Sequence, residues 1–538
     1  MPTSAIDPPA ATVRRATLRP DIPLLLILAF GAFLRLQYID MPMAEAHRWR
    51  EVFNADIARN FAERSMNILY PQVNWGGAAD PYVGSEFPLM HWLVAVGYRV
   101  FGEDAIVGRL VSVAFSLATI WAVFALGARL FGVAAGRGAA FLMAISPSAV
   151  FFGRFFISDT PMLFFSVAAL LAWVVYFETR RTTAAVAGSL ATALACLVKL
   201  PAVIMLAPIA WAAWEASRWA ALRDRRLLAG IAGALAATAL WYWHADVLFH
   251  RTGLGVAIWH QAGSYPASIA VAAGPWAGVY NVANFAMLRQ PDFYTQMIDR
   301  IWALHLTPGG FILALVGLVA MWRRPRRQII DVWMAVVVFY MLMTAEGNRN
   351  HEYYQLPLVP PATLFFGLAA APAFDGGWLR ANGGRLAGPM ASAAALLFTA
   401  WLSFNYSGVV RTLYRPDNLD LAPIQAGAAL QQIVSPDSLV VTVEYELHGN
   451  NSPILLYWMR RRGWTFDLAS ISPHVIDLLH KRFGATYFVT SIWPRLAETH
   501  PDVAEYLRAR RQVTVPNAPA NLMLFDLTSD SDGAQARR

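Results

Sequence analysis

Charged and aromatic side chains crowd residues 44–89, directly after the first apolar segment of the chain. The stretch begins with AEAHRWREVFNADIARNF and ends with GSEFPL. A carboxylate held against an aromatic side chain in a partly dry pocket is suited to act as a general base. Glu51 is the first choice for this role because Trp49 lies two residues before it, and Glu45 and Asp56 are the next choices.

The sequence ADIARNF predicts a helix in this stretch. Asp56 and Arg59 are three residues apart, so they can form an ion pair on the surface of that helix. Ile57 and Phe61 would lie on another stripe and face apolar neighbours. The pair is therefore as consistent with a structural role as with a functional one. Glu51 precedes the predicted helix and is free to point into a cleft.

Other candidate residues come from segments that are far apart in the sequence. GSEFPL contributes Glu86, GRFFISDTP contributes Arg154 and Asp159, a turn contributes Lys199, and EGNRNHEYYQLP contributes Arg349, His351 and Tyr354. Arginine suits anions because its guanidinium presents forked donors. Because these segments are far apart in the sequence, the elements of the fold must bring the groups together.

Composition indicates that most of the chain is dissolved in lipid. Of the 538 residues, 57% are apolar and 14% are charged, and the mean hydropathy is +0.42. Soluble domains have roughly 45–50% apolar and 25% charged residues. The basic residues outnumber the acidic ones, 43 to 35, but they cluster between apolar segments, as in topology control, so we expect no nucleic-acid partner. The single cysteine, Cys196, lies in an apolar run and is expected to be a small packing residue.

About eleven apolar segments predict transmembrane helices. They cover residues 22–39, 105–131, 138–152, 160–177, 184–198, 201–214, 227–244, 309–322, 329–344, 354–371 and 386–404. Residues 1–21 predict a disordered cytoplasmic tail. Arg35, one turn from the end of the first segment, is expected to reach the lipid headgroups or contact a lipid phosphate.

The short loops between these segments carry the basic clusters. They contain Arg129 and Arg137, Arg180 and Arg181, Arg223, Arg225 and Arg226, and Arg323, Arg324, Arg326 and Arg327. All fall on the side of the N-terminal tail, so the positive-inside rule makes that side cytoplasmic. The connections 40–104 and 245–308, and everything after about residue 408, then face outward. Residues 89–101 are apolar but short, and they predict a helix along the membrane interface.

Residues 418–530 have a different pattern, in which strands alternate with helices. We predict helices in QAGAALQQIV, SPHVIDLLHKRFG and PDVAEYLRARR, and strands in SLVVTVEY, ATYFVTS and ANLMLFDL. This alternation predicts a small outer α/β domain, which would serve as a lid or docking platform. The overall prediction is an α-helical polytopic membrane protein with a bundle at residues 22–408, this C-terminal domain, and a disordered tail at 531–538.

Several motifs in order resemble those of the GT-C superfamily. An anchor helix is followed by ADIARNF, by EFPL before an interfacial helix ending in FG, by GRFFISDTPMLFF and by NHEYYQLPLVPPA. The likeness covers about residues 22–370 and is closest to the bacterial branch related to protein O-mannosyltransferases and to the aminoarabinose transferase of lipid A. It implies a helical bundle that transfers a sugar from a polyprenyl-phosphate donor to an acceptor on the non-cytoplasmic side.

The resemblance also implies roles for individual residues. The family's acid in the first outer loop deprotonates the acceptor hydroxyl, and in an ungapped match it falls on Arg50, with the neighbouring acid on Glu51. The acid of the second loop matches Asp159. Glu86 matches a position that helps to bind a metal in the aminoarabinose transferase branch, so a divalent metal is a candidate cofactor. The lysine that follows that position is Phe87 here.

These observations predict a glycosyltransferase of the bacterial inner membrane with its active site facing the periplasm. Cations would stabilise the leaving lipid phosphate while a carboxylate takes the proton of the acceptor hydroxyl, in a single displacement with inversion at the sugar carbon. Arg59, Arg154, Lys199 and Arg349 are candidate phosphate contacts, and His351 would bind the donor or pack at the interface. The acceptor could be a lipid, a glycan or a protein.

Two other classes of protein remain open from the sequence. A transporter or flippase would place its charged groups at mid-membrane on broken helices, and solute uptake without sugar transfer would favour it. A nonenzymatic assembly factor of the cell envelope would bind a partner through the C-terminal domain, and Glu51 and Asp159 would then be dispensable.

Overall fold

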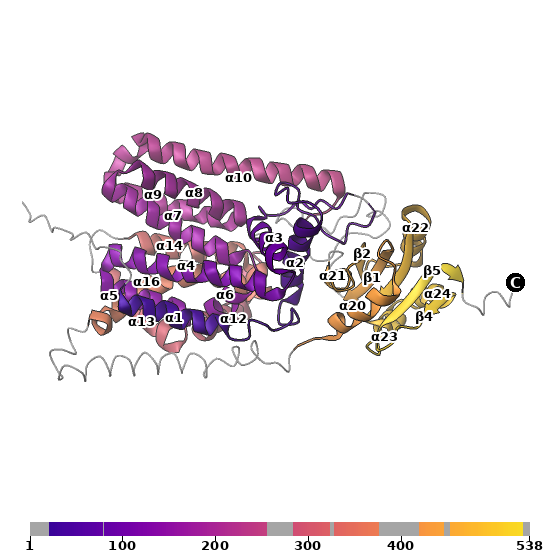
Figure 1. The fold of residues 1–538 in the computed structure, drawn as a ribbon. Helices are drawn as coiled ribbons and strands as arrows, with labels where there is room; N and C mark the ends of the chain where they lie inside the picture. The colour runs from indigo at the N-terminus through magenta and orange to yellow at the C-terminus, as the bar shows by residue number, and fades with distance from the viewer. Residues whose placement is uncertain are drawn as a thin grey trace, which may run out of the picture.

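The computed structural model describes residues 21–78, 80–255, 283–322, 328–375, 419–445 and 452–530. Most of them lie in an elongated bundle of helices that run side by side, with a small sheet beyond one end (Figure 1). Several predictions fall outside the described residues. They are the tails at 1–20 and 531–538, the basic run at 323–327 and the span at 386–404.

The helices that build the bundle are apolar along most of their length. They are α1 (Ile22–Leu36), α4 (Ala105–Phe131), α5 (Val133–Ile145), α6 (Pro147–Arg154), α7 (Asp159–Thr179), α8 (Thr182–Val198), η1 (Leu200–Met205), α9 (Leu206–Ser217), α10 (Arg225–Thr252), α13 (Pro308–Trp322), α14 (Ile329–Met343) and α16 (Val359–Asp375). Short segments connect them: η2 (Arg218–Arg223), η3 (Met287–Arg289), α12 (Pro291–Asp299), the π-helix η4 (Arg300–His305), α15 (Ala345–Asn350) and η5 (Glu352–Leu358).

Among the described residues, five helices are long and apolar enough to cross a membrane. The number is up to seven if each of two bent pairs, α5 with α6 and α12–η4 with α13, counts as one span. The helices α1, α8 and α14 are apolar but shorter. Each predicted span within the described ranges is helical, and the total of about eleven spans remains a prediction.

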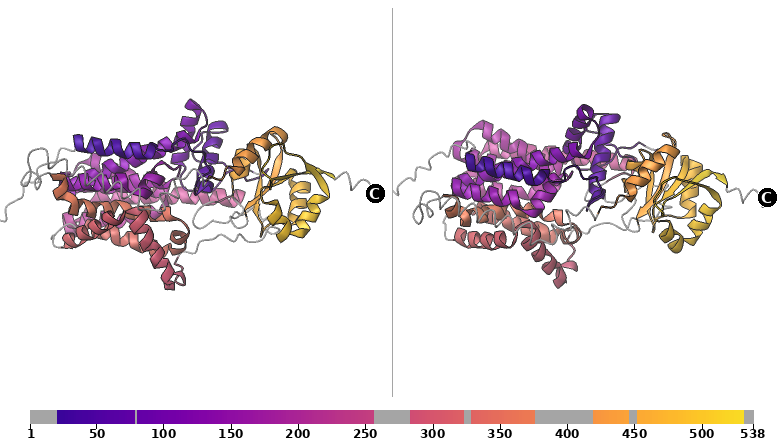
Figure 2. Two further views of the ribbon diagram at one scale, coloured as in Figure 1. Left: turned by 90° about the horizontal axis from the view of Figure 1, so that it is seen from below. Right: turned by 60° about the horizontal axis from the view of Figure 1, so that its bottom comes forward.

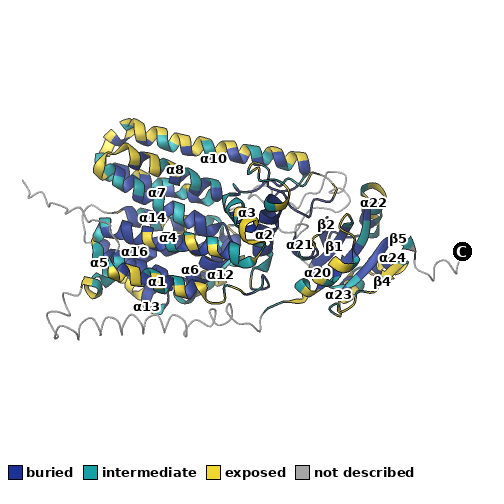
Figure 3. Cartoon of the chain, in the orientation of Figure 1, coloured by how far each residue is buried: buried dark blue, intermediate teal, exposed yellow. Residues whose placement is uncertain are grey.

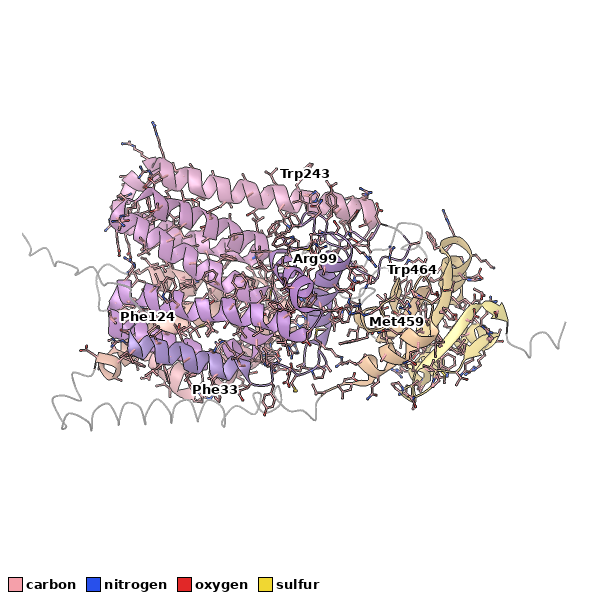
Figure 4. All side chains as sticks on the ribbon, viewed as in Figure 1. Phe33, Arg99, Phe124, Trp243, Met459 and Trp464 are labelled. Carbon is pink, nitrogen blue, oxygen red and sulfur yellow. The ribbon has the colours of Figure 1, made fainter. Side chains whose placement is uncertain are left out.

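Close helix packing forms the centre of the bundle. A Cβ atom on Gly136 of α5 would lie 2.6 Å from the backbone oxygen of Phe124 in α4, so only glycine permits this approach. The outer surfaces are apolar as well, as the exposed Trp243 of α10 and Phe33 of α1 illustrate (Figure 4). Figure 3 shows exposed residues along the outer side of α10 and buried residues within the bundle. Apolar side chains on both sides of a helix are typical of a bundle that lies in lipid.

The described basic loop residues meet at one end of the bundle. Ion pairs join Arg129 to Glu178 and Arg180 to Asp224, and Arg137 pairs with Asp21 at the start of α1. The opposite end carries α2 (Arg48–Glu63) and α3 (Leu89–Phe101), which lie between the bundle and the sheet (Figures 1 and 2). The predicted separation of the basic loops from residues 44–89 is therefore confirmed.

Two predictions about helix ends in this half of the chain are wrong. Arg35 does not reach toward lipid, because its side chain is fully buried. It donates hydrogen bonds to Ser116 Oγ and to the backbone oxygens of Met143, Ala144 and Ala149, at the 63° break between α5 and α6. The connection predicted to begin at residue 245 begins later, since α10 continues two turns to Thr252.

The described C-terminal residues form a five-stranded sheet in the order β2-β1-β3-β5-β4. The strands are β1 (Leu439–Tyr445), β2 (Arg462–Asp467), β3 (Ala485–Thr490), β4 (Arg510–Val513) and β5 (Met523–Asp530). The first three are parallel, while β5 runs antiparallel to β3 and β4. The helices are α20 (Ala422–Ile433), α21 (Ile454–Trp458), α22 (Pro473–Phe483), α23 (Trp493–Thr499) and α24 (Pro501–Arg508).

The predicted strands and helices of this region are confirmed, but β2, β4, α21 and α23 were missed. Arg510 and Arg511, predicted at the end of a helix, begin β4 instead. Both residues pair with β5 through the backbone, and this pairing decides their conformation. Arg511 also forms an ion pair with Asp526 on that strand. That the region is a separate outer domain remains a prediction.

Candidate active site

A buried ion network lies where α2 meets α4 and α6. Both carboxylate oxygens of Glu51 accept hydrogen bonds from Arg109 of α4, at 2.8 and 2.9 Å. Glu45 accepts hydrogen bonds from Arg109 at 3.0 Å and from Arg154 at 2.9 and 2.5 Å. None of the four side chains is more than 1% exposed. Two carboxylates therefore face two guanidinium groups, which compensate their charges away from water.

This network corrects the predicted position of Glu51. The residue lies inside α2 rather than before it, because the helix begins at Arg48. In that first turn the side chain faces α4, and Arg109 occupies both of its oxygens. Arg154, expected as a phosphate contact, is likewise held by Glu45. These residues fix the geometry of the segment that follows α1.

Asp56 and Arg59 do not form the predicted pair with each other. Asp56 accepts a hydrogen bond from the backbone N–H of Asn74 at 2.9 Å, whereas Arg59 pairs with Glu103 at 2.5 Å and donates to the backbone oxygen of Tyr457 at 2.7 Å. Burial raises the pKa of Asp56 to about 7, although the Asn74 N–H and the charge of Arg59 oppose the shift. The predicted apolar stripe of Ile57 and Phe61 is confirmed.

A second group of charges lies next to the same end of α2. We call it the Lys199 cluster, and it consists of Arg50, Glu86, Asp159, Lys199, Tyr353 and Tyr354. Lys199 Nζ lies 2.5 Å from Asp159 Oδ2. The same nitrogen is 5.4 and 5.3 Å from the ring centres of Tyr353 and Tyr354. Five separate parts of the chain thus place a cation, two acids, a second cation and two phenols together.

Local structure positions the acids, the lysine and the tyrosines of the Lys199 cluster. Asp159 is the first residue of α7. Lys199 lies in extended backbone between α8 and η1, where Pro201 prevents α8 from simply continuing. The segment with Glu86 is held because Phe87 N–H donates to the Leu197 oxygen at 3.0 Å. The tyrosines lie in η5, which follows His351.

Glu86 faces both cations of the cluster. Burial raises the pKa of its carboxyl and Asp159 adds to the shift, while Lys199 and Arg50 oppose it. Its carboxylate makes no hydrogen bond within the described part of the chain. Burial disfavours the charge of Arg50, but Tyr353, Tyr354 and Glu86 hold the pKa of this guanidinium above its ordinary value. Both cations therefore keep their charge beside an acid whose carboxylate accepts no hydrogen bond from the described residues.

Arg349 is a predicted phosphate contact, and His351 is predicted to bind the donor or to pack at the interface. The His351 ring stacks on Tyr353 with 5.1 Å between centres. Burial lowers the pKa of His351 to about 3, and the charge of Arg50 adds to the shift, so the ring is neutral near pH 7. Arg349 points elsewhere, because it donates to the side chain of Gln290 at 2.6 Å. Neither residue brings a positive charge to the Lys199 cluster.

The sequence did not identify Arg50, Arg109 or Tyr353 as functional candidates. Arg109 lies in an apolar helix more than fifty residues from its acidic partners, so its role depends on tertiary packing. The sequence did contain a signal for Lys199. Only two of the 43 basic residues of the chain are lysines, so a lysine in this position is a conspicuous choice.

The described residues do not fit the candidate metal site at Glu86. They contain no group of three or more His, Cys, Asp or Glu side chains that could hold a metal ion. Glu86 and Asp159 instead lie beside Lys199 and Arg50, whose charges oppose the binding of another cation. The same charges favour an anion such as a phosphate.

Residues 84–243 match the family model described as dolichyl-phosphate-mannose-protein mannosyltransferase. This stretch contains Glu86, Asp159 and Lys199 but neither Arg50 nor the tyrosines of η5. No curated protein matches the chain by sequence.

Solved structures resemble the chain over most of its length. ArnT from Cupriavidus metallidurans in the apo state has a TM-score of 0.61 at 15% identity, covering 93% of this chain and 97% of ArnT. The same protein bound to undecaprenyl phosphate has a TM-score of 0.61 at 16% identity, with the same coverage. The Archaeoglobus fulgidus oligosaccharyltransferase in complex with Zn and sulfate has a TM-score of 0.58 at 13% identity, covering 93% of this chain and 74% of its own. At these identities the likeness establishes the fold.

Proposed function

We propose that this chain, which has the fold of the GT-C glycosyltransferases, transfers a sugar from a polyprenyl-phosphate-linked donor to a hydroxyl group of a lipid, glycan or protein. The observation that supports this most is the Lys199 cluster, in which Arg50 and Lys199 lie beside Glu86 and Asp159 at one end of an apolar bundle. A donor with a long lipid tail suits this place, because its tail can remain in lipid while its phosphate reaches the cations.

The proposed reaction follows from the charges. When the bond between the anomeric carbon and the phosphate oxygen breaks, the electron pair stays with the lipid phosphate, which gains negative charge. Preorganised cations stabilise that charge as it develops. Arg50 and Lys199 take this role, and Asp159 positions the Lys199 ammonium. The acceptor oxygen attacks from the opposite face of the sugar, so a single displacement inverts the anomeric carbon.

The proposed location is the bacterial inner membrane, with the Lys199 cluster on the periplasmic side. The basic residues paired at the far end of the bundle support this orientation, because short basic loops are retained in the cytoplasm. The sheet beyond α2 and α3 would then also be periplasmic.

The test is sugar transfer by the purified protein in liposomes. Undecaprenyl-phosphate hexoses and pentoses with a labelled sugar are offered together with a membrane extract as the source of acceptors. Wild type is expected to move the label to an acceptor and to release undecaprenyl phosphate. Lys199→Met is expected to lower this rate about 100-fold or more, the effect of losing one preorganised charge contact.

The second lysine provides a matched control. Lys481 is exposed on α22 and pairs only with Asp477 of its own helix among the described residues. Lys481→Met is therefore expected to transfer sugar at the wild-type rate. Failure of wild type to consume any donor of the panel would contradict sugar transfer. An unchanged rate in Lys199→Met would contradict the assigned site.

A further inference from the structure

His47 occupies an unusual position next to the Lys199 cluster. It is the residue before α2, and its backbone is left-handed, with φ 63° and ψ 20°. Such a conformation is uncommon for a residue with a Cβ atom, and it persists when the surroundings hold it. The ring of His47 lies 5.3 Å from the ring of Tyr353, which belongs to the cluster.

Glu352 of η5 holds the His47 ring through one of its ring nitrogens. His47 Nε2 lies 2.9 Å from Glu352 Oε1, although the two residues are 305 positions apart. Their side chains are 17% and 16% exposed, so the pair is mostly buried but reachable. Phe152 and His351 complete the setting, with ring centres 5.9 and 5.8 Å from that of His47.

The hydrogen bond to Glu352 fixes which nitrogen of His47 can accept a proton. An ionised carboxylate only accepts hydrogen bonds, so Nε2 carries the hydrogen. Nδ1 of the neutral ring then has its lone pair free, and it makes no hydrogen bond within the described ranges. An imidazole oriented by a carboxylate on one nitrogen and open on the other is the arrangement of a general base.

The acids of this end of the bundle are paired with cations or buried away from His47. Glu45 and Glu51 are paired with arginines, and Asp56 faces Asn74 next to the apolar side of α2. Asp159 is paired with Lys199. Glu86 lies among the cations proposed to bind the phosphate. A separate base next to Tyr353 would keep proton removal apart from phosphate binding.

We infer that His47 is the general base for the acceptor hydroxyl and that Glu352 is its positioning residue, an inference that rests on the proposed sugar transfer. As the acceptor oxygen bonds to the anomeric carbon, its proton moves to His47 Nδ1. The bond from that carbon to the phosphate oxygen breaks, and its electron pair leaves with the lipid phosphate. His47 then returns the proton to the medium.

The decisive variant is His47→Asn, because asparagine tolerates the left-handed backbone but cannot accept the proton. It is expected to lower kcat about 100-fold or more, within the range for loss of a general base, while the KM for the labelled donor changes less than threefold. His244→Asn is the matched control, since His244 lies outside the cluster and pairs with the backbone oxygen of Leu69. It should keep the wild-type rate.

Dependence on pH and chemical rescue separate a base from a structural histidine. The titratable groups in contact with His47 are Glu352, His351 and Tyr353, while Arg300 acts on Glu352 and Arg50 acts on His351. Wild-type kcat should fall as the medium is acidified, whereas the residual rate of His47→Asn should lack this fall. Added imidazole should restore at least tenfold activity to His47→Gly. Glu352→Gln should lower kcat about tenfold and retain the acid fall.

The outcomes distinguish this inference from the proposed function. If wild type transfers no sugar, the proposed function fails, and the inference fails with it. If wild type transfers sugar and His47→Asn is equally fast, only the inference is wrong. A variant that loses thermal stability and donor binding together, without rescue of His47→Gly by imidazole, would assign His47 a structural role and overturn the inference.

Discussion

At the level of single residues, the surroundings of Glu51 and Glu86 give two similar carboxylates different properties. Arg109 engages both oxygens of Glu51, and neither side chain is exposed. The carboxylate of Glu86 has two cations near it but accepts no hydrogen bond from the described residues, and burial raises the pKa of its carboxyl. We therefore expect a change at Glu51 to affect stability and a change at Glu86 to affect the reaction.

Glu51→Gln tests the first expectation. The neutral amide leaves Arg109 with less compensation, and a buried pair that loses one partner is destabilised by about 3 kcal/mol or more. Thermal unfolding of the protein in detergent should show a clearly lower Tm. Glu63→Gln is the control, because Glu63 forms an exposed ion pair with Arg460. A slower reaction with an unchanged Tm would instead restore Glu51 as a candidate base.

Asp56 predicts a dependence of stability on pH. Its pKa is about 7 in the folded protein, above the ordinary value of 3.8. Between these values the folded state holds the proton more tightly than the unfolded state, so this residue makes the protein less stable as the pH rises from about 4 to 7. Asp56→Asn should raise the Tm at pH 8 and have little effect at pH 4.

The asparagine of that variant can still accept the hydrogen bond from Asn74 N–H. Its Tm should therefore depend less on pH than the Tm of wild type between pH 4 and 7. A lower Tm than that of wild type at pH 8 would show that the carboxylate stabilises the fold, contrary to the expectation.

At the level of elements, the break between α5 and α6 requires donors for the carbonyl groups that a continuous helix would satisfy. Ser146 caps α6 by accepting a hydrogen bond from Ala149 N–H. Arg35 of α1 supplies donors to Met143, Ala144 and Ala149, so one buried side chain from a neighbouring helix compensates the break. The helix α6 begins at this break and ends at Arg154, which belongs to the ion network.

Arg35→Met is expected to destabilise the bundle by about 3 kcal/mol or more, because each buried carbonyl left without a donor costs about 1–3 kcal/mol. Thermal unfolding in detergent measures this, with the exposed Arg482→Met on α22 as the control. If Arg35→Met unfolded at the wild-type temperature, water or lipid would have to satisfy these carbonyls, and the capping role would be wrong.

At the level of the whole molecule, the C-terminal sheet is attached to the segment that carries the site. Backbone hydrogen bonds join Gly463 to Asn74 and Gly77, and Arg59 donates to the backbone oxygen of Tyr457 and lies 3.6 Å from the centre of its ring. Side chains of α2, β1 and α20 share one hydrophobic cluster. The sheet thus supports α2 from the side opposite the bundle.

Arg59→Ala tests this attachment. Loss of the contacts with Glu103 and Tyr457 should increase amide hydrogen exchange in α21 and β2 about tenfold or more, while α4 and α5 remain protected. Arg99→Ala is the control, since Arg99 of α3 is exposed and bonds only to the backbone oxygen of Ala62 in the described structure. Equal exchange in both variants would show that Arg59 does not hold the sheet.

Much of the fold was predictable because it depends on local pattern. Long apolar segments became helices, and residues 89–101 formed a short helix with the predicted limits. The helix that ends at Gly484 was predicted because glycine permits the positive φ of 77° found there. The strands β2 and β4 were missed because neither has a clear alternating pattern, and both depend on their neighbours in the sheet.

The sequence by itself determined that the protein is a helical membrane protein and which of its segments carry charge, because hydropathy and residue type are local properties. It also identified Glu86, Asp159 and Lys199, which do come together. Only the tertiary structure decided that Arg109 neutralises Glu51, that Arg349 points away from the Lys199 cluster and that Glu352 pairs with His47. Those pairings join residues from 58 to 305 positions apart, and helix packing alone brings them within hydrogen-bond distance.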